Sequence, residues 1–231
     1  MIENKTKTLS EWTARFEQIA RKELGDDESH DLFHFRRVFS LSITIAEKEH
    51  DVADRLVLLA AAYLHDIINP PKNSELRSKA SALSADRAGE ILYEERFPKE
   101  KISAVQHAIE THSFSAGIEP KTLEAKIIQD ADRIESLGAI GLARTFYIAG
   151  RLGSRLFDPA DLLADRRTLD DSKYAVDHFQ TKLLKLPQLM KTAEGKRLAT
   201  ERAVILKTYM NQLIDELAIS QINFPDARRQ N

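Results

Sequence analysis

The chain has 231 residues, of which 42% are hydrophobic and 30% charged, a composition that suits one medium-sized globular domain with a real core. A net charge of −2 provides no overall field for nucleic acid or membranes, and the absence of cysteine excludes disulfides, thiolate nucleophiles and thiolate-bound metals. With no apolar signal segment and no run near the roughly 18 apolar residues of a membrane span, we expect a cytoplasmic protein.

The first helices are indicated by capping residues and helical periodicity. The segment Thr8-Leu9-Ser10-Glu11 has the spacing of a capping box and predicts a helix that ends before Gly25. In the next predicted helix, His34 lies on the same stripe as the apolar residues Val38, Leu41 and Ile45. Its imidazole therefore faces inward, either as a metal ligand or as a core histidine bonded to a carbonyl. His30, one turn earlier, could support it.

The third predicted helix, from about Asp51, carries an adjacent His65-Asp66 pair at the end of a very apolar run. Buried polar groups cost free energy unless they are paired or bind a metal, so the pair indicates a metal site, with a simple helix-end cap as the alternative. Two prolines then end the helix, and a basic, hydroxyl-rich loop with Lys72 and Lys79 follows. This loop favours a phosphate clamp over a solvated connection.

Two further helices are predicted before residue 113. Ser84 is expected to cap the fourth helix, and Pro98 is expected at the opening of the fifth. In the fifth helix His112 lies close to the apolar face, whereas His107 points elsewhere. His112 is therefore the better candidate for a site residue.

The predicted helix that starts at about Pro120 has apolar residues on two sides, with Asp130 on one and Asp132 on the other. Buried carboxylates require a metal or arginines as partners, and periodicity alone does not decide which aspartate is the ligand. Gly138 and Gly141 indicate close packing or a kink.

The last third of the sequence starts with a charged, irregular stretch that ends near Asp171. Ser172 is expected to cap a helix in which His178 and Lys182 are i, i+4 neighbours, either on a solvated face or as a pair that contacts phosphate. A final amphipathic helix and a loose tail follow, and no segment is convincing as a strand. We therefore expect an all-α fold.

The order of the candidate ligands resembles that of the HD-domain metal-dependent phosphohydrolase superfamily, whose pattern is a His, an adjacent His-Asp and a distant Asp. The matching residues are His34, His65, Asp66 and Asp132, the last within Ala131-Asp132-Arg133-Ile134. Flanking segments over nearly the whole chain are similar to a branch of small, single-domain bacterial HD hydrolases. The resemblance implies an HD-type helical bundle at residues 1–150, a helical extension of the same domain at 151–219 and a loose tail at 220–231.

The resemblance also implies a reaction class: hydrolysis of nucleotides or related phosphate esters and anhydrides, with nucleoside triphosphate pyrophosphohydrolysis as one form, by attack of a metal-activated water on phosphorus. The ligands are His34, His65, Asp66 and Asp132, and this mixed nitrogen and oxygen set suits one divalent transition metal, Mn²⁺ above Fe²⁺, Co²⁺, Ni²⁺ or Zn²⁺. His112 is the expected general acid, and Asp66 or Asp130 the expected base because Asn69 stands where some relatives have an acidic residue. The residues expected to bind substrate are His30, Arg37, Lys72, Lys79, Arg133, His178 and Lys182.

We expect a small phosphorylated substrate, no nucleic-acid or membrane partner, and a monomer or homodimer. Two alternatives stay open: hydrolysis of a guanosine polyphosphate, and a module that senses a nucleotide or metal without turnover.

Overall fold

A computed structural model describes residues 7–23, 32–70, 75–113 and 116–222 of the chain. Within these ranges the structure consists of helices, turns and loops, and the β-type pairing is confined to an isolated bridge between Arg155 and Tyr174. The predicted all-α fold class is thus confirmed. The chain forms two compact units: Met1–Glu135 with Met190–Lys196, and Ser136–Leu189 with Arg197–Asn231.

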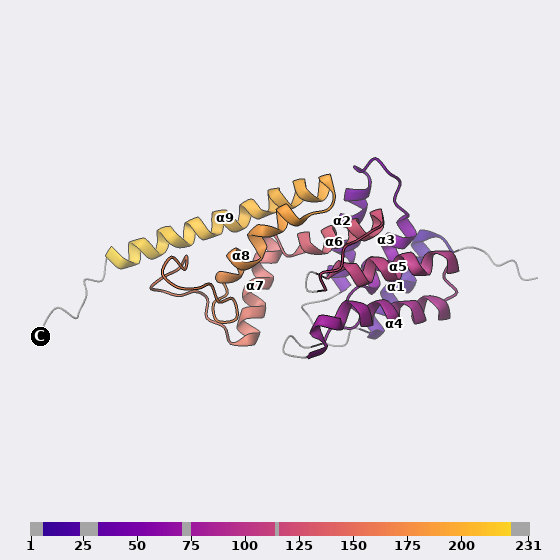
Figure 1. Ribbon diagram of the computed structural model, residues 1–231, viewed down its shortest axis with the longest axis horizontal. Helices are drawn as coiled ribbons and strands as arrows, with labels where there is room; N and C mark the ends of the chain where they lie inside the picture. Colours follow the sequence, from indigo (N-terminus) through magenta and orange to yellow (C-terminus); the bar gives the residue numbers. More distant parts are fainter. Residues whose placement is uncertain (1–6, 24–31, 71–74, 114–115, 223–231) are drawn as a thin grey trace, which may run out of the picture. The chain divides into compact units, whose positions relative to one another are not determined.

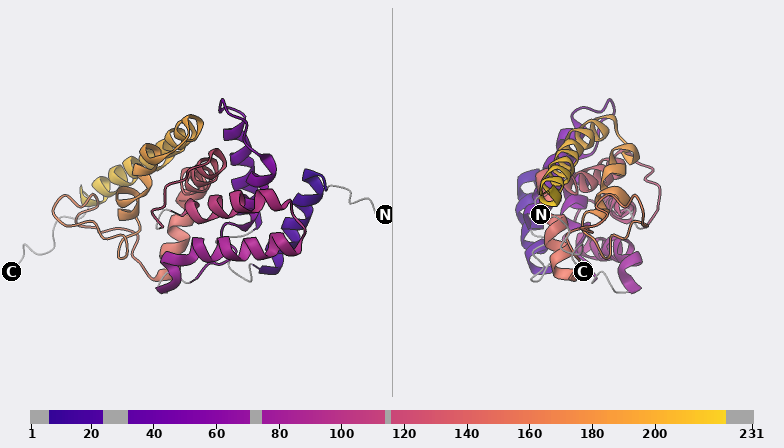
Figure 2. Two further views of the ribbon diagram at one scale, coloured as in Figure 1. Left: turned by 45° about the vertical axis from the view of Figure 1, so that its right-hand side comes forward. Right: turned by 90° about the vertical axis from the view of Figure 1, so that its left-hand side faces the viewer.

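The first unit is built around one buried helix. Its helices are α1 (Leu9–Glu23), α2 (Leu32–Ala46), α3 (Arg55–Leu64), the 3-10 helix η2 (Glu75–Lys79), α4 (Ala80–Glu94), α5 (Lys99–His112) and α6 (Leu123–Glu135). Helix α3 contacts α1, α2, α4, α5 and α6 (Figure 1), and all its residues from 57 to 64 are buried. Helices α4 and α5 run side by side (Figure 2). Residues at the C-terminal end of α3 are therefore surrounded by the other helices of this unit.

Local hydrogen bonds explain where these helices begin. The capping box at α1 is confirmed, because Thr8 N donates to Glu11 Oε2 at 2.6 Å and Glu11 N donates to Thr8 Oγ1 at 3.2 Å. Helix α3 begins at Arg55, so the expected start near Asp51 is wrong. The cap is Asp54, whose carboxylate accepts hydrogen bonds from Leu56 N and Val57 N and so satisfies amides that the helix leaves unpaired.

The predicted cap of α4 is also wrong. The helix begins at Ala80, directly after η2, and Ser84 lies inside it, fully buried. The Ser84 hydroxyl accepts a hydrogen bond from Ile68 N at 3.1 Å and is 3.2 Å from Ile68 O, to which it donates. Ser84 thus holds the loop that follows α3.

The second unit contains α7 (Gly138–Leu152), α8 (Asp177–Thr181), the 3-10 helix η3 (Leu183–Leu189) and α9 (Ala193–Ile222) from Arg197 onward. Gly138 and Gly141 were expected to mark close packing or a kink. Helix α6 ends at Glu135 and a new one begins at Gly138, which has a φ of +71°, and Gly141 packs so closely that a Cβ would overlap the backbone carbonyl of Ser136. Ser172 does not cap α8, which begins at Asp177; its hydroxyl donates to Asp170 instead.

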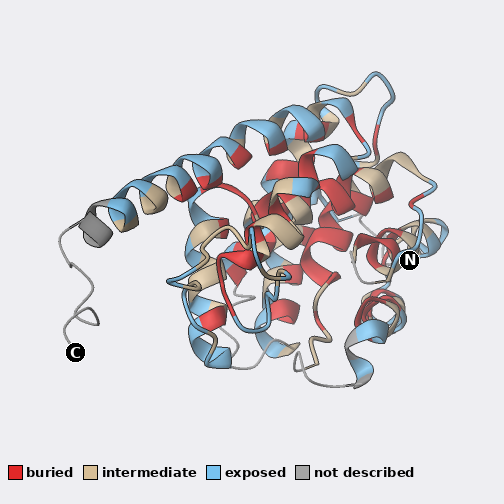
Figure 3. Ribbon diagram, turned by 60° about the vertical axis from the view of Figure 1, so that its left-hand side comes forward, coloured by how far each residue is buried: buried red, intermediate tan, exposed pale blue. Residues whose placement is uncertain are grey.

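As far as Met210, helix α9 is buried along one side and exposed along the other (Figure 3), and its buried residues include Ala199, Ala203, Leu206 and Met210. Near its middle, Tyr209 packs against Phe146 and Phe179, with ring centroids 5.5 and 6.0 Å away. None of the helices in the described ranges is both long and apolar enough to span a membrane.

Candidate metal centre

The end of α3 places His65 and Asp66 at the centre of the first unit. The helix ends at Leu64, His65 keeps helical angles (φ −64°, ψ −34°) as its C-cap, and the chain then turns away. His65 is fully buried, whereas Asp66 is partly exposed. The pair thus presents one buried imidazole and one carboxylate that solvent can reach.

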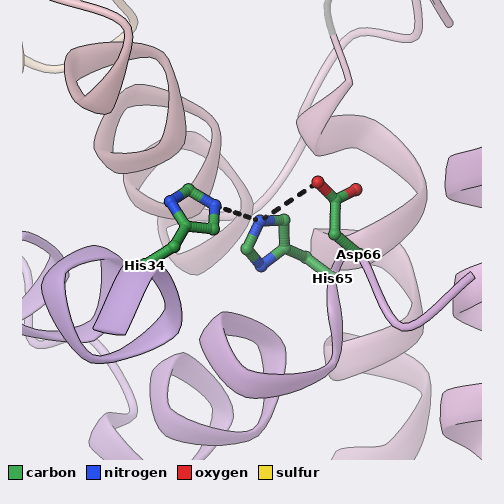
Figure 4. Close-up of side chains that lie close together, drawn as sticks. All are labelled: His34, His65 and Asp66. Atoms are coloured by element: carbon green, nitrogen blue, oxygen red, sulfur yellow. Dashed lines mark hydrogen bonds and ion pairs between the residues drawn. The ribbon is translucent and has the colours of Figure 1, made fainter. Parts of the chain in front are cut away.

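The rings of His34 and His65 point toward one another (Figure 4), with their Nε2 atoms 3.3 Å apart. His34 comes from α2 and is 1% exposed, as its position on the apolar stripe predicted. His65 Nδ1 lies 2.9 Å from Ala62 O, and because a carbonyl only accepts hydrogen bonds, Nδ1 carries the proton in the neutral ring. The lone pair of His65 Nε2 therefore faces His34, where only a proton or a cation could relieve the repulsion between two ring nitrogens.

Two carboxylates complete this cluster. Asp66 Oδ2 lies 3.8 Å from His65 Nε2, while Asp132 Oδ1 lies 3.5 Å from His34 Nε2 and 3.7 Å from His65 Nε2. One ligand atom from each of His34, His65 and Asp66 falls within 4.8 Å of the others. The arrangement brings together all the ligands expected from the sequence, and it favours Asp132 over Asp130 for the fourth position.

The charges of the cluster favour a cation at its centre. Burial opposes a positive charge on His65, but the carboxylates of Asp66 and Asp132 outweigh it and raise the pKa of His65 to about 9. Burial likewise acts to raise the pKa of Asp132, but the rings of His65, His112 and His34 outweigh it and lower that pKa. Nitrogen and oxygen donors of this kind fit a divalent transition metal better than Ca²⁺ or Mg²⁺, which prefer oxygen alone.

His112, at the end of α5, borders the cluster. Its Nδ1 lies 2.6 Å from Ile109 O, which again places the proton on Nδ1 and leaves Nε2 as the functional nitrogen. That Nε2 lies 3.4 Å from Asp66 Oδ1, and the ring packs edge-on against His65 with centroids 4.9 Å apart. His107, by contrast, accepts a hydrogen bond from Lys121 N through Nε2 at 3.0 Å.

Asp130, the alternative ligand and base, is occupied elsewhere. Its fully buried carboxylate accepts hydrogen bonds from Lys191 N at 2.9 Å, Thr192 N at 2.8 Å and Thr192 Oγ1 at 2.7 Å. Burial raises the pKa of Asp130, although these hydrogen bonds act to lower it. A side chain on Gly195 would overlap this carboxylate. Asp130 thus fastens the start of α9 to α6 within the first unit.

Glu135 is a buried site residue that the sequence reasoning missed. It is fully buried at the end of α6, its Oε2 accepts a hydrogen bond from Arg37 Nε at 2.6 Å, and the same oxygen lies 3.7 Å from His34 Nδ1. Burial acts to raise the pKa of Glu135, but His34 and Arg37 outweigh it and lower that pKa. Its spacing of three residues from Asp132, which places both on one helix face, was the available signal. Arg37, expected to bind phosphate, is held by this carboxylate.

The other residues expected to bind substrate are less clearly placed. Lys79 is exposed at the end of η2, and Arg133 is half-buried on α6. Burial lowers the pKa of Arg133, while the charges of Asp130, Asp132 and Glu119 act to raise it. His30 and Lys72 lie outside the described residues.

His178 and Lys182 belong to the second unit. His178 Nδ1 lies 2.9 Å from Asp171 Oδ2, and Lys182 N donates to His178 O at 3.1 Å. Their expected contact with phosphate stays a prediction.

The sequence matches a known protein family and a related bacterial protein. The profile of the family described as HD domain matches residues 32–137, which contain all four candidate ligands. The chain is 34% identical over 195 residues to the uncharacterized protein YpgQ of Bacillus subtilis (strain 168), an alignment that spans 82% of this chain and 86% of YpgQ.

Several solved structures are similar to this chain over most of its length. A crystal structure from Lactobacillus plantarum has a TM-score of 0.71 and 29% identity, and covers 92% of this chain and 99% of its own. A structure described as an HD-superfamily hydrolase, from Bacillus thuringiensis, has a TM-score of 0.68 and 30% identity, with coverages of 90% and 98%. The structure of Bacillus subtilis YpgQ in complex with ADP has a TM-score of 0.68 and 30% identity, with coverages of 88% and 94%.

Proposed function

Because the chain belongs to the HD-domain superfamily of hydrolases, we propose that it is a metal-dependent phosphohydrolase that acts on nucleotides or related phosphate esters and anhydrides. The observation that carries the proposal is the convergence of His34, His65, Asp66 and Asp132 from three helices. ADP in the related YpgQ structure supports a nucleotide as the ligand class.

These four residues would hold one divalent transition metal, with Mn²⁺ as our first choice. When bound, the metal supplies an acidified water and offsets negative charge on the phosphoryl oxygens. The buried histidines direct their Nε2 atoms toward the centre, whereas Asp66 is partly exposed.

We assign proton transfer to His112 together with Asp66. The Nδ1 proton of His112 is held by Ile109 O, so a second proton is taken up and given away at Nε2. Asp66 Oδ1 lies 3.4 Å from that atom and would orient the ring so that Nε2 can pass a proton to the leaving oxygen. Asp130 has no part in this step because its carboxylate is bound to Lys191 and Thr192.

Positive side chains of the first unit would neutralise the substrate's phosphates. Arg133, next to Asp132 on α6, and Lys79, exposed after the turn that follows Asp66, are the described candidates in the first unit.

The test combines metal analysis with a substrate panel. Purified protein is assayed for bound metal, and then for release of phosphate and pyrophosphate from NTPs, dNTPs, nucleoside diphosphates and monophosphates, and guanosine polyphosphates with Mn²⁺. We expect turnover that a chelator abolishes. His65→Ala is expected to lose both metal and turnover, and His107→Ala, a histidine outside the cluster, is expected to retain both.

Two outcomes would overturn the proposal. Undiminished turnover in chelator-treated protein would exclude a metal-dependent reaction. Stoichiometric metal without turnover of any nucleotide would identify a sensing module instead.

A further inference from the structure

The buried carboxylate of Glu135 contacts both an arginine and a candidate metal ligand. It is fully buried, and a buried carboxylate costs free energy unless it is paired and hydrogen-bonded. Arg37 Nε provides one partner at 2.6 Å, but the same oxygen is also directed at His34 Nδ1, 3.7 Å away. One carboxylate therefore lies between an arginine and the back of a candidate metal ligand.

The geometry at His34 gives this contact a chemical consequence. His34 Nε2 faces the cluster, at 3.3 Å from His65 Nε2 and 3.5 Å from Asp132 Oδ1. Its Nδ1, on the opposite edge of the ring, faces Glu135. A carboxylate on that side favours the proton on Nδ1, keeps the Nε2 lone pair available and makes Nε2 more basic.

We propose that Glu135 is a positioning residue for the metal site: it sets the tautomer and the orientation of His34. This inference rests on the proposed metal site and extends it to a residue that touches neither metal nor substrate. His65 is oriented by Ala62 O within its own helix, whereas His34 depends on a side chain from α6.

The test compares two variants that break the same ion pair. Glu135→Gln removes the charge behind His34 with little change in shape, whereas Arg37→Gln leaves the carboxylate facing His34. Mn²⁺ affinity is measured by calorimetric titration, and the environment of the bound ion by its electron paramagnetic resonance spectrum. We expect Glu135→Gln to weaken Mn²⁺ binding about 10- to 100-fold and to alter the spectrum. Arg37→Gln is expected to keep affinity and spectrum close to those of the parent protein, even where its melting temperature falls.

Glu17→Gln serves as a matched control. Glu17 forms a comparable pair with the neighbouring Arg36, with contacts of 2.7 and 2.8 Å, at a partly exposed site on α1 and α2, and it also accepts a hydrogen bond from the Tyr63 hydroxyl at 3.2 Å. This variant is expected to bind Mn²⁺ normally.

Equal losses in Glu135→Gln and Arg37→Gln would reduce Glu135 to a structural partner of Arg37, and unchanged binding in Glu135→Gln would also overturn the inference. Failure of the metal site itself is distinguishable, because the parent protein would then bind no Mn²⁺.

Discussion

At the scale of single residues, the site depends on helix-end carbonyls. His65 and His112 both lie at the end of a helix, and each Nδ1 approaches the carbonyl three residues earlier, Ala62 O and Ile109 O. The last carbonyls of a helix lack partners within the helix, so a terminal histidine can use one to fix its own ring. The sequence predicted which histidines face inward. Which ring nitrogen faces the cluster, however, depends on these hydrogen bonds to the carbonyls.

The same scale gives a prediction for Ser84. Its hydroxyl pairs with both the N–H and the C=O of Ile68, two residues after Asp66, and thereby fixes the turn that presents Asp66. Ser84→Ala is expected to cost about 1–3 kcal/mol, because two backbone groups lose their partner, and to weaken Mn²⁺ binding. Urea unfolding and metal titration measure the two effects.

Ser42→Ala is the matched control for Ser84, because Ser42 is equally buried but its hydroxyl donates only to Val38 O in its own helix. Such a bond adds little to helix stability, so we expect nearly unchanged stability and metal binding. An effect of Ser42→Ala on metal binding as large as that of Ser84→Ala would contradict a specific role for Ser84.

At the scale of elements, the second half of α6 carries three carboxylates with three different sets of partners. Asp130 binds the start of α9, Asp132 faces the two histidines, and Glu135 meets Arg37 and His34. Periodicity predicted the helix and its buried acids, but a helix does not specify which neighbour packs on each face. The resemblance selected Asp132, whereas Glu135 required the tertiary position of α2.

The N-terminus of α3 gives a second prediction. Asp54→Ala should cost about 1 kcal/mol in urea unfolding, because two amides lose their cap. Partial burial acts to raise the pKa of Asp54, but hydrogen bonds from Lys101 and the α3 backbone outweigh it and lower that pKa. The charged cap is therefore fully stabilising above the unfolded-state pKa of about 3.9, and its contribution is lost as the pH falls through the lower folded-state pKa.

Asp54→Asn separates the cap from the charge, since an amide oxygen still accepts from the backbone. We expect it to keep most of the stability at neutral pH and to lack the acid-dependent loss that Asp54 contributes. Equal destabilisation by Asn and Ala would mean that the charge, not the cap, is what matters.

At the scale of the whole molecule, the candidate ligands all belong to the first unit, which ends at Glu135 and regains residues 190–196. The resemblance implied a core at 1–150 and an extension of the same domain at 151–219, and position 150 lies inside α7. The compact units follow from contacts between distant residues, which the sequence pattern does not show. No local sequence pattern predicts that Met190–Lys196 joins the first unit, because Lys191 and Thr192 bind Asp130, which lies 61 and 62 positions earlier.

Metal binding should therefore stabilise the chain unevenly. Mn²⁺ at about 100 times its Kd stabilises the state that binds it by about 2.7 kcal/mol. We expect hydrogen exchange with Mn²⁺ to slow mainly in peptides from α2, α3, α5 and α6, and little in peptides from residues 156–189. His65→Ala should remove the effect, and equal protection of both units would show that they open as one.

The bond between Asp130 and the Lys191–Thr192 turn also bears on how such a protein can be rearranged during evolution. A recombination that replaced everything after Glu135 would leave a fully buried carboxylate without its donors, unless the incoming segment supplied an equivalent turn. The segment after Glu135 is therefore not freely replaceable as a whole, because it carries a part of the first unit. Whatever sequence follows the metal-binding helices in a descendant must preserve that anchor or arrive together with a change at Asp130.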